Sequence, residues 1–252
     1  MKTLIVGKNS FLSKNLNLKN TIKISYNEVN DYNLNDFSKL ILVSFPPKYK
    51  DSIEKDFKFE KKLFDSFRNK KIVYFSTQKV YAYKLNCSEQ DELSPDSYYG
   101  ENKLNIEKII FNMTDKAQIL RVSSVFSNNN FAKDSFFFQL KDNWLKKNKI
   151  IFNISLNSIK DFITINYLKI ILDNFLETDE YGIFNIGSKN GISIRDLLSL
   201  IYKNLVPENI IELENQVRSR TLNNSKICTL LKLNPTKIHQ ETEKQISEFN
   251  LF

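Results

Sequence analysis

The sequence predicts an α/β fold with a doubly wound parallel sheet, and two kinds of segment indicate it. Apolar and β-branched runs at residues 2–6, 40–45, 72–77 and 118–126 are typical of strands buried in parallel sheets. Residues 51–70 instead place apolar side chains at helical spacing among charges, as in helices that cover such a sheet. The chain has 252 residues, 41% of them hydrophobic, which is enough for one large domain or for a domain with a smaller companion.

A glycine turn follows the first of these strands directly. Gly7 ends the strand, and residues 8–16 continue as a turn and the start of a helix. This order places backbone N–H groups and a helix N-terminus where they can bind a pyrophosphate, and the small residues Ser10 and Ser13 let a ligand come close. An ordinary strand-to-helix turn that binds no nucleotide remains the alternative.

A phenol and an ammonium group lie one helical turn apart in residues 94–103. Pro95 suits a first helical turn, Ser97 suits its cap, and Tyr99 and Lys103 share a face of the helix that follows. A phenol titrates near pH ~10, and a cation held beside it would favour the phenolate and lower its pKa. Tyr99 could then act as an acid or a base, whereas the alternative is a surface tyrosine beside a solvated lysine.

Two motifs carry a resemblance to a known family. Ser76-Thr77-x-x-Val80-Tyr81, followed by Tyr99-Gly100-x-x-Lys103-Leu104-x-x-Glu107, resembles the extended short-chain dehydrogenase/reductases that act on nucleotide sugars, also called the NAD-dependent epimerase/dehydratase family. The resemblance implies a Rossmann-type fold with a small, mostly C-terminal substrate-binding domain. It implies an NAD(P)-binding domain at residues 1–168, with 127–150 contributing in part to the substrate site, and a substrate-binding domain at residues 169–252.

The resemblance also implies roles for individual residues. Thr77 and Tyr99 would contact the reacting sugar oxygen, and Lys103 would hold the nicotinamide ribose and lower the pKa of Tyr99. The family has further glycines at Ser10 and Ser13 and small alanines at Phe45 and its neighbours, so this chain departs from the pattern there. The cofactor-binding residues would be Gly7, Asn9, Ser10, Phe11, Leu12, Ser44, Phe45, Tyr99 and Lys103. The substrate-binding residues would be Thr77, Gln78, Arg218 and Arg220.

The segment after the second predicted strand bears on the choice of cofactor. Tyr26 and Asn27 stand where an acid would hold the ribose hydroxyls of NAD. We therefore expect NADP(H) to be favoured, with NAD(H) possible.

The residues beside Thr77 reduce the number of family reactions that the chain could catalyse. Family dehydratases follow the hydroxyl with an Asp-Glu pair, and decarboxylating relatives keep the Glu, but this chain has Gln78 and Lys79. The epimerase-reductases of the family use a Cys at the position of Gln78 and a distant His, and the single His of this chain, His239, lies near the C-terminus. A nucleotide-sugar 4-ketoreductase that uses NADPH, with Tyr99 as general acid, is the first expectation. A nucleotide-sugar 4-epimerase with tightly held NAD, and a non-catalytic binding module with a degenerate glycine loop, are the alternatives.

The composition excludes several other classes of protein. The net charge of +8 is spread along the chain among acids, so we expect no nucleic-acid partner. The chain has two cysteines, Cys87 and Cys228, and a single His, so we expect neither a disulfide framework nor a metal site. No apolar run reaches the ~18 residues of a membrane span, and residues 1–7 are too short for a signal peptide, so a cytoplasmic protein without membrane contact is expected. Residues 51–70 and the Tyr99 helix match the pair that forms a homodimer interface in many relatives, although both could simply cover the sheet.

Overall fold

The computed structural model describes residues 2–128, 135–202 and 210–249. Contacts divide the chain into two compact units, the first made of Met1–Ala82, Glu89–Val122 and Lys169–Asn185, and the second of the remaining segments. The two units do not divide at residue 168, where the sequence analysis expected the boundary. After residue 168 the chain returns to the first unit and adds a strand to its sheet. Residues 129–134, part of the stretch expected to contribute to the substrate site, lie outside the described residues.

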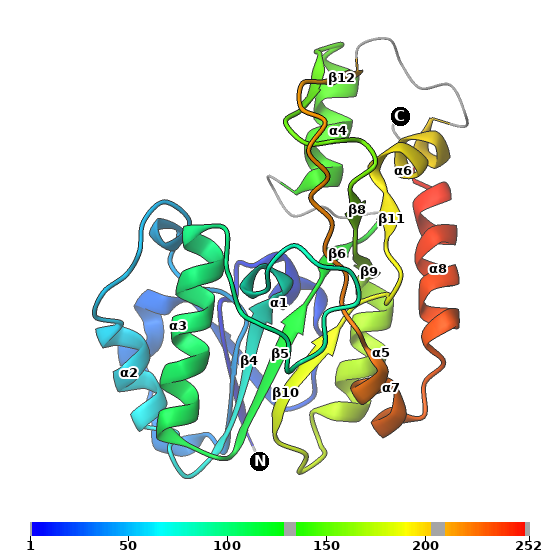
Figure 1. Cartoon of the computed structure of the whole chain (residues 1–252). Coiled ribbons are helices and arrows are strands. Elements are labelled where there is room, and N and C mark those ends of the chain that lie inside the picture. Colours follow the sequence, from blue (N-terminus) through cyan, green and yellow to red (C-terminus); the bar gives the residue numbers. More distant parts are fainter. Residues whose placement is uncertain (1, 129–134, 203–209, 250–252) are drawn as a thin grey trace. The chain divides into compact units, whose positions relative to one another are not determined.

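A six-stranded sheet forms the centre of the first unit, in the order β2-β1-β3-β4-β5-β10. Figure 1 shows β4, β5 and β10 side by side. The pairs β1–β2, β1–β3, β3–β4 and β4–β5 are parallel, which confirms the predicted Rossmann-type α/β fold. The strand order reverses at β1, whose neighbours are β2 and β3, and open α/β sheets bind ligands at the carboxyl ends of strands beside such a point. The strands are β1 (Thr3–Val6), β2 (Thr21–Ile24), β3 (Lys39–Leu42), β4 (Lys71–Thr77), β5 (Ala117–Val122) and β10 (Gly182–Ile186).

Helices and short 3-10 turns connect these strands. Helix α3 begins at Tyr98, where the Ser97 side chain accepts a hydrogen bond from the Gly100 N–H at 3.3 Å, so Pro95 precedes the helix instead of forming its first turn. The long helix expected over residues 51–70 is shorter, because Phe57 adopts left-handed backbone angles (φ 47°) immediately before α2. The elements are α1 (Phe11–Asn15), η1 (Tyr26–Asp31), η2 (Leu34–Asp36), η3 (Pro47–Lys50), α2 (Lys58–Asp65), η4 (Gln78–Val80), α3 (Tyr98–Met113) and α5 (Ile165–Phe175).

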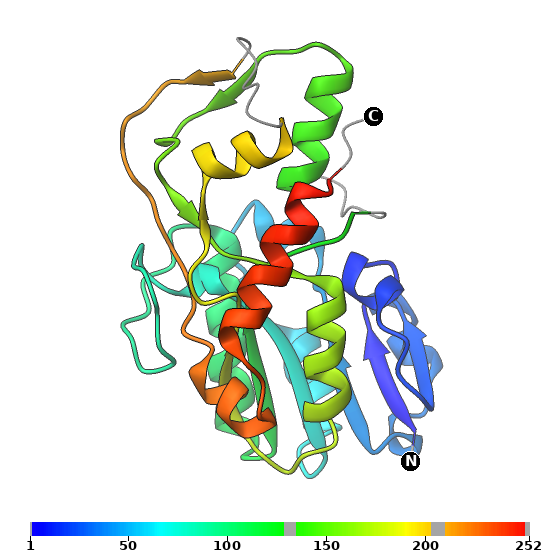
Figure 2. The ribbon, with the colours of Figure 1, turned by 90° about the vertical axis from the view of Figure 1, so that its right-hand side faces the viewer.

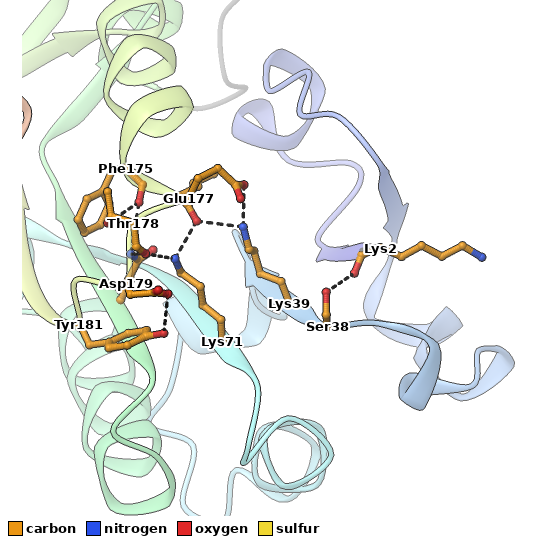
Figure 3. Close-up of polar contacts among 11 residues, drawn as sticks. Lys2, Ser38, Lys39, Lys71, Phe175, Glu177, Thr178, Asp179 and Tyr181 are labelled. Atoms are coloured by element: carbon orange, nitrogen blue, oxygen red, sulfur yellow. Dashed lines mark hydrogen bonds and ion pairs between the residues drawn. The ribbon is translucent and has the colours of Figure 1, made fainter.

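Two lysines at the amino ends of adjacent strands hold the turn that follows α5 (Figure 3). The Lys39 ammonium donates to the Leu176 carbonyl at 2.9 Å, and the Lys71 ammonium donates to the same carbonyl at 2.7 Å and to that of Thr178. Cations favour the negative end of a helix dipole, so this arrangement fixes the segment that leads to β10. A cavity of about 940 Å³ opens here, at the end of the sheet opposite to Thr77.

The second unit has short strand pairs and its own hydrophobic core. Asp161 is fully buried and joins three segments, since its carboxylate accepts from the Ser188 N–H and hydroxyl, both at 2.8 Å, and from the Leu222 N–H at 2.9 Å. Helix α8, red in Figure 2, packs against α6 and β9. The elements are β6 (Ser124–Phe126), α4 (Phe136–Leu145), β7 (Ile150–Phe152), β8 (Ile159–Lys160), β9 (Phe162–Thr164), β11 (Ile192–Ser193), α6 (Ile194–Ile201), β12 (Ile210–Glu212), α7 (Ser225–Leu231) and α8 (Pro235–Ser247).

Among the described residues, no helix combines the length and apolar character needed to cross a bilayer. The same residues contain no cluster of three or more His, Cys, Asp or Glu side chains that could hold a metal ion.

Candidate active site

The predicted catalytic residues meet at the carboxyl end of β4. Thr77 is the last residue of this strand, and Tyr99 lies in the first turn of α3. The Tyr99 phenol and the Thr77 side chain form a hydrogen bond. Lys103 follows one turn later on the same helix, so the sequence prediction that these three residues lie close together agrees with the geometry.

Tyr99 is protonated in this environment. Burial of the phenol raises its pKa to about 12, and the hydrogen bond with Thr77 acts in the opposite direction without offsetting the burial. We expected Lys103 to lower the pKa of Tyr99, but the Lys103 ammonium lies 5.9 Å from the Tyr99 ring centroid and points to another acceptor. A second cation that the sequence analysis did not place here, the Lys79 ammonium, lies 5.6 Å from the same centroid.

Lys103 is almost completely enclosed, with 3% of the residue exposed. Its ammonium donates a hydrogen bond to the Phe75 carbonyl and lies 4.4 Å from the centroid of the Phe45 ring and 4.7 Å from that of Tyr74. Burial lowers the pKa of Lys103 to about 7, while the charge of Glu107 acts to raise it. The amine therefore titrates near neutral pH.

A buried ion pair supports this site from the next turn of α3. Glu107 and Arg121 each have 1% of the side chain exposed, and the Arg121 Nη2 lies 2.7 Å from the Glu107 Oε2. The Glu107 carboxylate also accepts from the Ser76 hydroxyl, and Arg121 Nη1 donates to the Tyr81 hydroxyl at 2.8 Å. This support was not predicted from the sequence, although the spacing could have indicated it: Lys103 and Glu107 share a helix face with Tyr99.

The glycine turn lies beside the carboxyl end of β3. Gly7 has a φ of 112°, and a Cβ there would lie 2.2 Å from the Ser44 hydroxyl oxygen, so both features require glycine. Ser10 caps α1 by accepting from the Ser13 N–H at 3.1 Å, and the buried Ser13 hydroxyl has no hydrogen-bond partner among the described residues. The predicted residues Asn9, Phe11 and Leu12 complete this turn, where the first N–H groups of a helix have no partner within the helix.

This turn fits a dinucleotide. It combines a left-handed glycine, close approach to the neighbouring strand and an unpartnered buried hydroxyl at the point where the strand order reverses. The serines that replace two family glycines are used for capping and packing, and they leave the turn intact.

An acid that the sequence analysis overlooked reaches the same turn. Glu28 lies four residues after the end of β2, and its carboxylate pairs with the Lys8 ammonium and accepts from the Ser25 N–H at 2.8 Å. These contacts lower the pKa of Glu28 to about 2, with the Lys8 hydrogen bond as the main cause. Tyr26, where an acid was looked for, donates its hydroxyl to the Ser44 carbonyl at 2.6 Å.

The predicted substrate-binding residues belong to both units. Gln78 follows Thr77 directly and begins η4. Arg218 and Arg220 are in the second unit, where Arg218 donates to the Gln216 side chain at 2.6 Å and the Arg220 guanidinium lies 4.4 Å from the Tyr83 ring centroid. Their role in binding a substrate stays a prediction.

Comparisons with known proteins agree with this architecture. Residues 66–149 match the family described as RmlD substrate binding domain, whereas no curated protein matches the chain in sequence. MoeE5 in complex with UDP-glucuronic acid and NAD superposes with a TM-score of 0.79 at 16% identity, over 100% of this chain and 98% of that one. A dTDP-4-dehydrorhamnose reductase from Clostridium acetobutylicum gives 0.75 at 18%, over 98% and 99%. A UDP-glucuronic acid 4-epimerase from Bacillus cereus, in complex with UDP-glucuronic acid and NAD, gives 0.74 at 21%, over 99% and 100%.

The matched segment contains Thr77, Tyr99 and Lys103, and the similar structures share the fold over nearly the whole length of the chain. The predicted resemblance to the extended short-chain dehydrogenase/reductases is therefore confirmed in the fold and, over residues 66–149, in the sequence.

Proposed function

We propose that the protein is an NAD(P)-dependent oxidoreductase that acts on a nucleotide-linked sugar, and specifically a 4-ketoreductase that uses NADPH. The observation that carries this proposal is the Tyr99 phenol, hydrogen-bonded to Thr77 at the carboxyl end of β4. A phenol with a pKa near 12 holds its proton at neutral pH, which is the state that a general acid needs at the start of a reduction.

Each residue then has a separate task. When bound, the nicotinamide supplies the hydride. Tyr99 gives its proton to the oxygen of the sugar carbonyl as negative charge develops there, and Thr77 stabilises that oxygen with a hydrogen bond. Lys103 supplies a positive charge one turn along α3 and would hold the nicotinamide ribose. Gln78 and Lys79, which replace the acid pair of dehydratases, leave the site without the carboxylates that an elimination needs.

The glycine turn and Ser44 would hold the rest of the cofactor. We favour NADP(H), because Tyr26 uses its hydroxyl on the Ser44 carbonyl and Glu28 is already paired with Lys8. The Lys8 ammonium would attract a 2′-phosphate, whereas a free Glu28 carboxylate would favour the ribose hydroxyls of NAD.

A 4-epimerase with tightly held NAD is the second candidate. It is supported by the similar structures whose names are UDP-sugar 4-epimerases, including those from Bacillus cereus and Methanobrevibacter ruminantium. The first step of an epimerase takes a proton from a sugar hydroxyl, and the raised pKa of Tyr99 disfavours that step in the structure described here.

The deciding experiment begins by heating the purified protein and identifying any released nicotinamide cofactor. The protein is then assayed for NADPH oxidation with dTDP-4-dehydrorhamnose, and for epimerisation of UDP-glucuronic acid and UDP-N-acetylglucosamine with NAD. Exchangeable NADPH with reduction supports the reductase, and retained NAD with epimerisation supports the second candidate. No binding of NADPH, NADH or NAD would overturn both and leave a non-catalytic binding module.

We also propose a homodimer through α2 and α3. Phe111 on α3 is 42% exposed, and Phe59 of α2 and Ile109 of α3 are only partly buried. Light scattering of the purified protein tests this proposal. A dimer that Phe111→Lys converts to a monomer supports it, whereas a monomeric wild type refutes it.

A further inference from the structure

The ammonium of Lys103 is held against aromatic rings. It lies 4.4 Å from the ring centroid of Phe45 and 4.7 Å from that of Tyr74. Because the lysine is 3% exposed, little water screens these contacts. The face of an aromatic ring attracts a cation, and the attraction is strongest where the cation is desolvated.

The nearby carboxylate of Glu107 does not take the place of the aromatic rings as the partner of the Lys103 ammonium. Glu107 is the carboxylate that acts on the charge of Lys103, but its oxygens accept from Arg121 and from the Ser76 hydroxyl. Within the described part of the chain, Lys103 forms no ion pair within 4.0 Å, and its hydrogen bond goes to the neutral carbonyl of Phe75. A buried ammonium with this surrounding depends on the ring faces for much of its favourable electrostatic contact.

The ring of Phe45 is fixed in its place by packing. Its centroid lies 5.3 Å from that of Tyr49 and 5.3 Å from that of Tyr99. The Tyr49 hydroxyl is anchored in turn, because it donates to both carboxylate oxygens of Glu60 at 3.0 Å in the core. Phe45 is therefore held between the anchored Tyr49 ring and the Tyr99 ring.

The loop that carries Phe45 is also tied to the helix that carries Lys103. Asn102, fully buried and adjacent to Lys103, donates to the Tyr49 carbonyl at 2.9 Å and to the Ser52 carbonyl at 2.7 Å. The same side chain accepts from the Glu54 N–H at 2.9 Å. Three hydrogen bonds from one side chain thus set the position of the loop relative to α3.

We propose that Phe45 is a positioning residue for Lys103: the face of its ring keeps the ammonium charged and aimed at the Phe75 carbonyl, one helical turn from Tyr99. Phe45 stands where the resembling family has small residues, so the contact is a property of this chain's own sequence. The proposal rests on the proposed function only in that the reaction uses the charge of Lys103, because the contact between ring and ammonium exists without substrate.

The test uses Phe45→Leu, which removes the ring and keeps apolar bulk, and Phe45→Tyr, which keeps the ring. Lysine ¹³Cε resonances are followed by NMR as the pH is raised, and Lys103 is assigned by its loss in Lys103→Met. In the wild type the ring faces should move the Lys103 ε-methylene protons upfield, and Phe45→Leu should reduce this displacement. The midpoint of the Lys103 titration should fall by about one pH unit in Phe45→Leu, equivalent to about 1.4 kcal/mol.

The control variant is Phe59→Leu. Phe59 packs on Tyr26 with a centroid distance of 4.8 Å in the same core, so its loss should leave the Lys103 signals and midpoint unchanged. Circular dichroism and the Tm establish that each variant is folded, and Phe45→Tyr should keep the Lys103 signals and midpoint of the wild type. An unchanged or raised Lys103 midpoint in folded Phe45→Leu overturns the proposal.

Kinetics separate this proposal from the proposed function. If the protein is a reductase, Phe45→Leu should lower kcat, leave the KM for the sugar unchanged and move the alkaline limb of the pH–rate profile down by about the same one pH unit. Wild-type reduction combined with an unchanged profile in Phe45→Leu refutes the positioning role alone. A wild type that binds no nicotinamide refutes the proposed function, and the NMR titration then decides the contact by itself.

Discussion

Removing the cation from the buried Glu107–Arg121 pair should strongly destabilise the first unit. Arg121→Met keeps an apolar stem of similar length but leaves the Glu107 carboxylate buried, with Ser76 as its remaining donor. Both partners are 1% exposed, so water cannot replace the lost contacts. Breaking a buried ion pair costs ~3–5 kcal/mol, which corresponds to a fall in Tm of about 6–20 °C for a domain of this size.

The assay is thermal and urea unfolding followed by circular dichroism, with two comparison variants. Arg68→Met breaks an ion pair whose partners are 58% and 65% exposed, and it should change the Tm little. The double variant Glu107→Gln/Arg121→Met should lose less stability than the sum of its single variants, because it leaves no uncompensated charge. A loss below about 1 kcal/mol in Arg121→Met would refute the reasoning, since an exposed pair could account for it.

Four further outcomes are expected. Tyr99→Phe should lose about 10²–10⁴-fold in turnover while keeping cofactor affinity, and Lys103→Ala should lose both; wild-type rates in Tyr99→Phe would contradict the role of the phenol. Gly7→Ala places a Cβ 2.2 Å from the Ser44 hydroxyl at a φ of 112°, so fluorescence titration should show weakened cofactor binding, and unchanged affinity would refute this. Glu28→Gln should bind NADPH more tightly relative to NADH, because it removes a negative charge beside Lys8, and an unchanged ratio argues against Lys8 as the group that attracts the 2′-phosphate. Wild-type stability should rise from pH 7 towards 10, because the pKa of Lys103 is about 7 in the folded protein and ~10.4 in the unfolded chain, which therefore binds more protons in this range. Urea unfolding of Lys103→Met should show a smaller rise, and the same dependence of stability on pH in both proteins would contradict this prediction.

Local signals predicted many elements of the fold well. The strand expected over residues 72–77 is β4, Lys71–Thr77, and the predicted cap at Ser97 accepts from the Gly100 N–H at 3.3 Å. The sequence also predicted that one site contains Thr77, Tyr99 and Lys103, because strand ends and helix faces follow from the spacing of residues.

Features that depend on distant contacts could not be predicted. The helix expected over residues 51–70 begins only after the left-handed Phe57, and Asn102, about fifty residues later, binds the backbone of Tyr49, Ser52 and Glu54 in the segment before it. The predicted lowering of the Tyr99 pKa was wrong, because the structure raises it. The shift depends on burial of the phenol and on where the Lys103 ammonium points, and neither follows from a four-residue spacing. The domain division differs because the sequence does not show that residues 182–186 pair at the edge of the first sheet.

This return of the chain sets the order in which the protein can be completed during synthesis. The strands β1 to β5 leave the ribosome first, but the sheet stays without β10 and without the segment that Lys39 and Lys71 hold until about residue 186 has emerged. Until then an unpaired β5 edge and two unpartnered ammonium groups are exposed to other chains. The sheet of the first unit is thus completed late and depends on many contacts between residues that are distant in the sequence. We expect it to fold slowly compared with a sheet built from consecutive segments.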